Sequence, residues 1–196
     1  MRPVDVLTFG FLTFLFLTTA IFSRQVPNAH LILSLYASLA AALFLLIYLR
    51  KKLTSKTLDI IYALIFPIIA LVLIFDSLGG LIQYINPVKY DDLLINIDYM
   101  IFKVHPTVAL ERFISPVLTE ILQFAYASYY FLPVILGVAL KIKGKEAEFD
   151  RMIFLVLLCF FLSYIGYFLV PAVGPRYTMN HLQGTELHGI FLRDKI

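Results

Sequence analysis

The sequence predicts an all-α integral membrane protein, built as a polytopic bundle of membrane-spanning helices. Of its 196 residues, 61% are hydrophobic and only 15% are charged, whereas a soluble domain has about 45–50% apolar and about 25% charged residues. The mean hydropathy is +0.88. The apolar residues form five long runs, each close to the roughly 20 residues that a helix needs to cross a bilayer. Helices are expected there because an unpaired backbone group in lipid is strongly destabilising.

The first three predicted spans occupy the N-terminal part of the chain. The first covers about residues 4–22. It has the position of a signal peptide, but its apolar stretch is longer than usual and no small-residue cleavage site follows, so we interpret it as a retained span. The second covers about residues 30–49 and stops at Arg50-Lys51-Lys52. The third covers about residues 58–75, with Asp76 and Gly79-Gly80 at its end.

The long connection over residues 77–116 contains two short predicted helices. Apolar residues in the 93–102 stretch recur with helical spacing, and Asp91 or Asp92 is placed to cap the start of this helix. A second helix is predicted over Pro106–Ile114, because proline suits a first helical turn. Both are too short to span, so we expect them to lie in the membrane interface or to pack on the bundle.

Spans four and five are predicted at about residues 117–140 and 152–170. The loop between them is rich in lysine and arginine, as is the loop between spans two and three. In an alternating chain these two loops share a side, which the positive-inside rule makes cytoplasmic. We therefore expect a cytoplasmic N-terminus, and we expect the 77–116 connection and the segment after Val170 to face outward, in a bacterial or archaeal cell membrane.

A polar stripe runs along one face of span four, formed at helical spacing by Thr119, Gln123, Tyr126 and Tyr130. Polar groups in a span either bond between helices or line a wet cavity, here one for a lipid headgroup. Both interpretations stay open. Glu120 lies beside the stripe. It either reaches the outer interface or pairs with an arginine such as Arg176.

The chain leaves its fifth span through the turn Pro171–Tyr177, which contains Gly174-Pro175-Arg176. Glycine and the flanking prolines favour a tight turn. The Arg176 guanidinium can hold two phosphate oxygens and stays charged, although arginines at such places also anchor to lipid phosphates. His181 and His188 follow. Each is a candidate base or nucleophile, or an inert loop histidine.

Several other kinds of site are not indicated. The sequence has no His/Asp/Glu spacing typical of a metal site, no P-loop, no serine-nucleophile elbow and no basic-aromatic surface for nucleic acid. We therefore expect no metal or cofactor and no nucleic-acid partner. Membrane lipids are the expected partners.

The order of motifs resembles the type 2 phosphatidic acid phosphatase (PAP2) superfamily, in the branch of inositol phosphorylceramide synthase-like proteins. The resemblance covers roughly residues 81–177. Its motifs are Asp92…Asp98-x-x-Ile-Phe…Pro106…Leu110-Glu111…Ser115-Pro116-x-Leu118-Thr119-Glu120, then Tyr126-x-x-Tyr129-Tyr130-x-Leu132-Pro133, and finally Pro171-x-x-Gly174-Pro175-Arg176-Tyr177.

The resemblance implies a six-span enzyme that cleaves or transfers phosphate esters of lipids at the non-cytoplasmic face without a metal. It gives Arg176 a phosphate-binding role, although the usual preceding lysine is missing. The candidate site is then Arg176, with these supporting residues: Gly174, Tyr177, Glu120, Gln123, Tyr126, Tyr130 and His181.

The two histidine-bearing signatures of the family, Pro-Ser-x-His and His-x3-Asp, do not occur in this sequence. We therefore expect residues 1–196 to form a single, C-terminally truncated domain that lacks the sixth span and is inactive alone. A partner polypeptide would supply the missing part. The alternative is a non-catalytic membrane protein that binds lipid headgroups or a partner subunit. A transporter is disfavoured, because the spans have few ionisable groups and no repeat pair.

Overall fold

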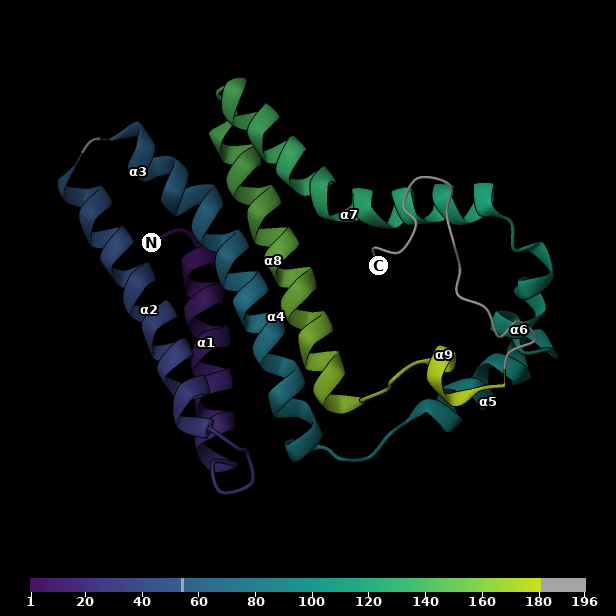
Figure 1. Cartoon of the computed structure of the whole chain (residues 1–196). Coiled ribbons are helices and arrows are strands. Elements are labelled where there is room, and N and C mark those ends of the chain that lie inside the picture. The colour runs from purple at the N-terminus through teal and green to yellow at the C-terminus, as the bar shows by residue number, and fades with distance from the viewer. Residues whose placement is uncertain (54, 181–196) are drawn as a thin grey trace. The chain divides into compact units, whose positions relative to one another are not determined.

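The computed structural model describes residues 1–53 and 55–180 (Figure 1). Within these ranges the protein is helical and has no strand, which confirms the all-α fold class. Five helices are long and apolar enough to cross a membrane. They are α1 (Pro3–Ile21), α2 (Ala29–Lys52), a continuous helix of α3, η1 and α4 (Lys56–Ile85), α7 (Pro116–Ile142) and α8 (Glu146–Leu169).

The chain divides into two compact units. Unit 1 comprises Met1–Val88 and Leu136–Leu169, and unit 2 comprises Lys89–Ile135 and the chain from Val170 onward. The long helix α7 contributes to both units, and Pro133 lies within it just before the change from one to the other. A proline inside a helix removes a backbone hydrogen bond and favours a bend.

Unit 1 is a helical bundle with an apolar core. Leu15, Tyr36, Ile74 and Phe161, from four different helices, are almost fully buried in it. The rings of Phe11 and Phe161 stack with centroids 4.1 Å apart and planes 8° from parallel. Such a pair contributes about 0.5–1.5 kcal/mol beyond its buried area. The core therefore fixes α1 against α8 through specific side-chain packing.

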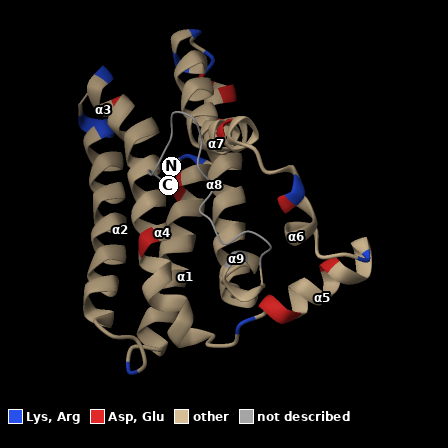
Figure 2. Ribbon diagram, turned by 45° about the vertical axis from the view of Figure 1, so that its right-hand side comes forward, with Lys and Arg blue, Asp and Glu red and all other residues tan. Residues whose placement is uncertain are grey.

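A polar network ties the helices together at one end of unit 1. The buried Asp5 carboxylate accepts hydrogen bonds from the Arg2 backbone N–H (2.7 Å) and from the Tyr62 hydroxyl (2.5 Å). Arg2 also pairs with Asp150 at the start of α8, at 3.0 Å. Both basic loops thus lie at the same end of the unit, and lysines and arginines gather there in Figure 2. In a chain whose spans alternate in direction, two loops at one end of the bundle lie on the same side of the membrane.

The third predicted span is longer than expected. It begins with α3 (Lys56–Ile60), passes through a π-helical turn, η1 (Ile61–Ile65), and continues as α4 (Phe66–Ile85). The predicted end near residue 75 assumed that Asp76 and the glycine pair break the helix, but both are accommodated within α4. The helix ends at Ile85, because Pro87 disfavours helical geometry at Asn86, the residue before it.

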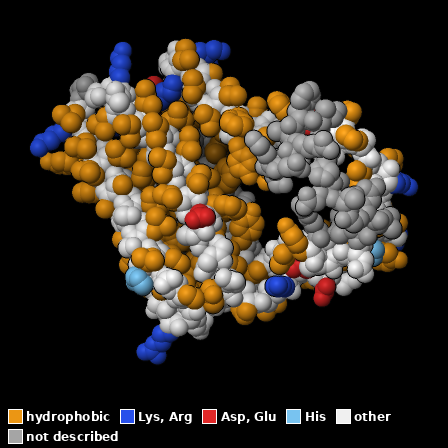
Figure 3. Space-filling model, in the orientation of Figure 1, with side chains coloured by type: hydrophobic (Ala, Val, Ile, Leu, Met, Phe, Trp, Pro, Cys, Tyr) orange, Lys and Arg blue, Asp and Glu red, His pale blue; other side chains and the backbone are white. Residues whose placement is uncertain are grey.

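Much of the apolar surface of unit 1 faces outward. Figure 3 shows hydrophobic side chains covering α1, α2 and α4 on the visible face. Phe44, for example, is 68% exposed, although it lies in the middle of α2. Large exposed apolar surfaces of this kind suit contact with lipid acyl chains and not with water.

Unit 2 contains the two short helical segments predicted between spans three and four. They are α5 (Asp91–Phe102) and α6 (Pro106–Leu110), the latter extended by one 3-10 turn, η2 (Glu111–Phe113). The two segments are bent by 63° relative to each other. Lys103, which ends α5, has a left-handed backbone (φ 59°) that turns the chain. The unit also holds the first part of α7 and the short helix α9 (Pro175–Thr178).

Candidate functional site

The candidate site is centred on the segment that leads from residue 171 into α9. Gly174 precedes α9 and has φ 106° and ψ 152°, a conformation that side-chain-bearing residues rarely adopt. Its carbonyl accepts hydrogen bonds from the Tyr177 backbone N–H (3.1 Å) and from the Thr178 hydroxyl (3.2 Å). Glycine is therefore required here by the backbone geometry, as the sequence predicted for a tight turn.

Asp91 holds this segment from the first turn of α5. Its Oδ1 accepts hydrogen bonds from the backbone N–H groups of Gly174 (2.7 Å) and Val173 (3.0 Å), and its Oδ2 lies 3.1 Å from the Val173 nitrogen. The neighbouring Tyr90 N–H donates to the Pro171 carbonyl at 2.9 Å. Two regions more than 80 residues apart in the sequence are thus joined by hydrogen bonds. We call residues 171–174 the clamped loop.

The role of Asp91 differs from the predicted one. The sequence suggested that Asp91 or Asp92 caps α5, but the residue at the cap position is Tyr90, which makes no side-chain capping bond. The Asp91 carboxylate instead accepts hydrogen bonds from the backbone of the clamped loop. No local pattern indicates this role, because the partners are backbone groups far away in the sequence.

The clamp also affects the ionisation of Asp91. Its side chain is covered by the loop, so that the residue is 5% exposed. Hydrogen bonds from the Gly174 and Val173 backbone N–H groups favour the charged carboxylate and lower the pKa of Asp91 below its ordinary value. Lys89 acts in the same direction more weakly. The clamp is therefore ionised, and its hydrogen bonds are charge-assisted, at neutral pH.

The backbone of Arg176 lies in α9, directly after the clamped loop. Its neighbour Tyr177 is 72% exposed. Because Asp91 occupies the Val173 and Gly174 N–H groups, these two donors are committed to the clamp and cannot at the same time bind a phosphate. His181 and His188 lie outside the described residues.

The polar stripe of span four lies on the part of α7 that belongs to unit 2. The hydroxyls of Tyr126 and Tyr130 are 3.2 Å apart, and both side chains are exposed. Thr119 is buried, and Glu120 is half-buried. The Gln123 Oε1 atom is buried and accepts no hydrogen bond within the described part of the chain. Gln123 thus offers an acceptor for a polar group.

The described residues include no group of three or more His, Cys, Asp or Glu side chains that could hold a metal ion. The clamped loop instead presents a fixed backbone next to an arginine. Such an arrangement suits the electrostatic binding of an anion, for which a guanidinium provides paired N–H donors.

Comparison with known proteins assigns a family. Residues 94–191 match the family described as the PAP2 superfamily. No curated protein and no solved structure matches the chain. The family match begins within α5, includes α7 and α8, and covers the clamped loop and Arg176. Because the match spans half of the sequence and agrees with the order of its motifs, the protein belongs to the PAP2 superfamily.

Proposed function

We propose that this protein provides the phosphate-binding part of a membrane enzyme that hydrolyses or transfers phosphate esters of lipids at the non-cytoplasmic face. Membership in the PAP2 superfamily supports a phosphatase-type, lipid-related function in general. The observation that carries the finer proposal is the clamped loop, because it fixes the backbone from which Arg176 extends. In the proposed mechanism the Arg176 guanidinium binds the lipid phosphate and stabilises the charge that develops during transfer.

The proposed face follows from the positions of the basic loops. Both loops lie at one end of unit 1, which the positive-inside rule assigns to the cytoplasm. The chain leaves α8 at the other end of that helix and enters the clamped loop. We infer that the loop faces outward and meets lipids of the outer leaflet.

Phosphoryl transfer also requires an activated nucleophile and a proton donor. In the family these roles belong to the two histidine signatures that this sequence does not contain. We therefore propose that the chain alone has no phosphatase activity, and that a polypeptide with Pro-Ser-x-His and His-x3-Asp completes the site. We also propose the inositol phosphorylceramide synthase-like branch, on the basis of the motif order.

A second candidate function is the binding of lipid headgroups without catalysis. The missing histidine signatures favour it. The buried, unpaired Gln123 Oε1 atom is compatible with either function, since the hydroxyl of a headgroup could donate to it.

The test is phosphate release from phosphatidic acid by membranes that contain the chain, with and without a co-expressed polypeptide carrying both signatures. We expect release only with the co-expressed polypeptide, and a loss of about 10²–10³-fold in rate with Arg176→Ala, as for removal of an oxyanion donor. Arg112→Ala, which removes an exposed arginine from η2, is the control and should retain activity. Full activity of Arg176→Ala would refute the assigned role. Release by the chain alone would show that its own residues suffice for catalysis.

A further inference from the structure

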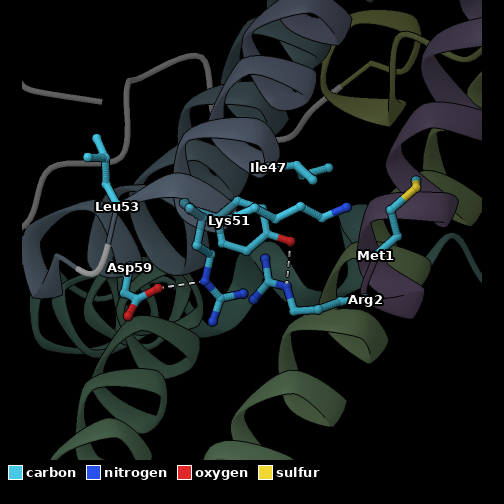
Figure 4. Close-up of a pocket in the computed structure, with 8 residues that line it drawn as sticks. Met1, Arg2, Ile47, Lys51, Leu53 and Asp59 are labelled. Atoms are coloured by element: carbon cyan, nitrogen blue, oxygen red, sulfur yellow. Dashed lines mark hydrogen bonds and ion pairs between the residues drawn. The ribbon is translucent and has the colours of Figure 1, made fainter.

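A second basic site lies in unit 1, where α1 begins and α2 ends. It is an open pocket of about 510 Å³ (Figure 4), within the range of about 300–1,000 Å³ that is usual for ligand sites. Three cationic side chains line it, those of Arg2, Arg50 and Lys51, against a single carboxylate, that of Asp59. The remaining wall consists of the Tyr62 ring and apolar side chains.

Arg2 forms a fixed wall of this pocket. Its Nε donates to the Tyr62 hydroxyl at 3.0 Å, its Nη1 pairs with Asp150 at 3.0 Å, and its Nη2 lies 3.6 Å from Asp5. Only 12% of its side chain is exposed. Its Nε and Nη1 groups therefore each commit a donor within the protein. Arg2 keeps the wall of the pocket in place, and the carboxylates of Asp5 and Asp150 offset much of its charge.

Arg50 and Lys51 provide donors for a ligand. The Arg50 Nε pairs with Asp59 at 2.5 Å, which uses one of the five N–H donors of a guanidinium. Lys51 makes no ion pair within the described residues, and its side chain extends across the pocket in Figure 4. The planar Arg50 guanidinium beside the ammonium group of Lys51 is a combination suited to binding phosphate.

Both arginines lie beside the Tyr62 ring. The guanidinium carbon of Arg2 lies 3.9 Å from the centroid of the Tyr62 ring, and that of Arg50 lies 4.9 Å from the same centroid. Tyr62 is 2% exposed and belongs to the π-helical turn η1. π-Helical turns inside longer helices are frequent at functional sites. Two cationic groups beside one ring favour the binding of an anion near them.

We propose that this pocket binds a phosphate group, carried by an anionic phospholipid headgroup or by a small phosphorylated solute. The site is separate from the clamped loop and does not depend on the function proposed for Arg176. Apolar residues such as Ile47 and Leu53 complete the lining, next to helix surfaces that suit lipid contact. A headgroup could thus bind with its acyl chains along the bundle.

The test measures binding of short-chain phosphatidic acid and of inorganic phosphate to the full chain in a nonionic detergent by calorimetry. All proteins carry Arg176→Ala, so that the clamped loop does not contribute. The double variant R50Q/K51Q should weaken binding by about tenfold or more, because it removes charge-assisted donors. The matched control K143Q/K145Q removes two lysines from the other basic loop and should bind within about twofold of its parent. Asp59→Asn should bind more tightly, since it removes the one carboxylate among the described residues that line the pocket.

Two results would overturn the proposal. The first is an equal loss in R50Q/K51Q and K143Q/K145Q, which would indicate general surface charge. The second is unchanged binding in R50Q/K51Q together with no gain in Asp59→Asn. If only phosphatidic acid binds, the source of the phosphate is a lipid. If inorganic phosphate binds as well and displaces phosphatidic acid, the pocket recognises the phosphate group itself and accepts a solute. Both of these results support the site.

Discussion

The two units differ in what they bury. Every buried apolar residue of the described chain lies in unit 1, where α1, α2, α4 and α8 pack around side chains such as Leu15 and Ile74. In the described part of unit 2 the buried residues are polar: Asp91, Glu111 and Thr119. Unit 1 is thus stabilised chiefly by packing, whereas unit 2 is held locally by hydrogen bonds such as those of Asp91.

The packed core that supports the fold thus lies in unit 1, whereas the clamped loop and Arg176 lie in unit 2. A bundle that is packed along its length changes little when a ligand binds. A segment held by a few hydrogen bonds opens at a lower free energy than a packed core. The clamped loop belongs to the second kind, so substitutions there should alter binding without unfolding the bundle. Four predictions test this distinction, in order of decreasing effect.

The largest effect is expected for Asp5→Ala in unit 1. This substitution removes the buried acceptor of the Tyr62 hydroxyl and of the Arg2 backbone N–H. It also removes one of the two carboxylates that pair with the Arg2 side chain, the other being that of Asp150. Breaking a buried pair on one side destabilises a protein by about 3–5 kcal/mol. Thermal unfolding in detergent should show a clear drop in the midpoint. A midpoint equal to that of the wild type would contradict the stabilising role of this polar network.

The second prediction compares phenylalanines of the two units. Phe161→Ala should destabilise the protein by about 1–3 kcal/mol, since it leaves a cavity beside Phe11. The hydrophobic contribution to this cost is smaller in a membrane than in water. Phe131→Ala, in unit 2, removes a side chain that is 63% exposed and should change stability by less than about 0.5 kcal/mol. Denaturation of both variants by the same method tests the comparison. Equal losses would remove the distinction between the units.

The third prediction concerns the clamp. Asp91→Ala leaves the N–H groups of Val173 and Gly174 without their acceptor, which destabilises the clamped loop locally. Hydrogen exchange at these two amides should become roughly tenfold faster or more, while the core of unit 1 keeps its protection. Asp92→Ala is the matched control, because it removes the adjacent, exposed acidic residue. If both variants behave alike, the clamp is not the cause of the protection.

The smallest expected effect is that of pH on the stability of the clamped loop. The pKa of Asp91 is lower in the folded protein than in the unfolded chain, so the clamp contributes its full stability above the ordinary aspartate value of about 3.9. This stability is lost as the pH falls through the lower, folded-state pKa. After correction for intrinsic rates, protection of the Gly174 amide should be constant between about pH 5 and 8 and should fall only below about pH 4. A loss of protection near pH 6 would point to a different titrating group.

Much of the fold could be predicted from the sequence. Hydropathy identifies spans because lipid imposes helices on long apolar runs, and the two short helices of unit 2 follow from the spacing of their apolar residues. The continuation of the third span through Gly79-Gly80 could not be predicted, because a glycine pair is compatible with both a break and a helix. Bends and π-helical turns, such as η1, likewise depend on packing.

The site was less predictable than the fold. Gly174 and Arg176 stand out because their residue types restrict conformation and charge locally. The roles of Asp91 and Asp5 cannot be recognised in this way, since each depends on groups more than 50 residues away in the sequence. The positions of the His181 and His188 side chains fall outside the described residues, so their predicted roles stay predictions.

The central claim is that the clamped loop presents Arg176 to the phosphate of a lipid. The most direct test is the binding of short-chain phosphatidic acid to the full chain that carries R50Q/K51Q, which silences the pocket of unit 1. Adding Arg176→Ala should weaken this binding by about tenfold or more, and adding Arg112→Ala should leave it within about twofold. Equal binding by the Arg176→Ala and Arg112→Ala proteins would contradict the account.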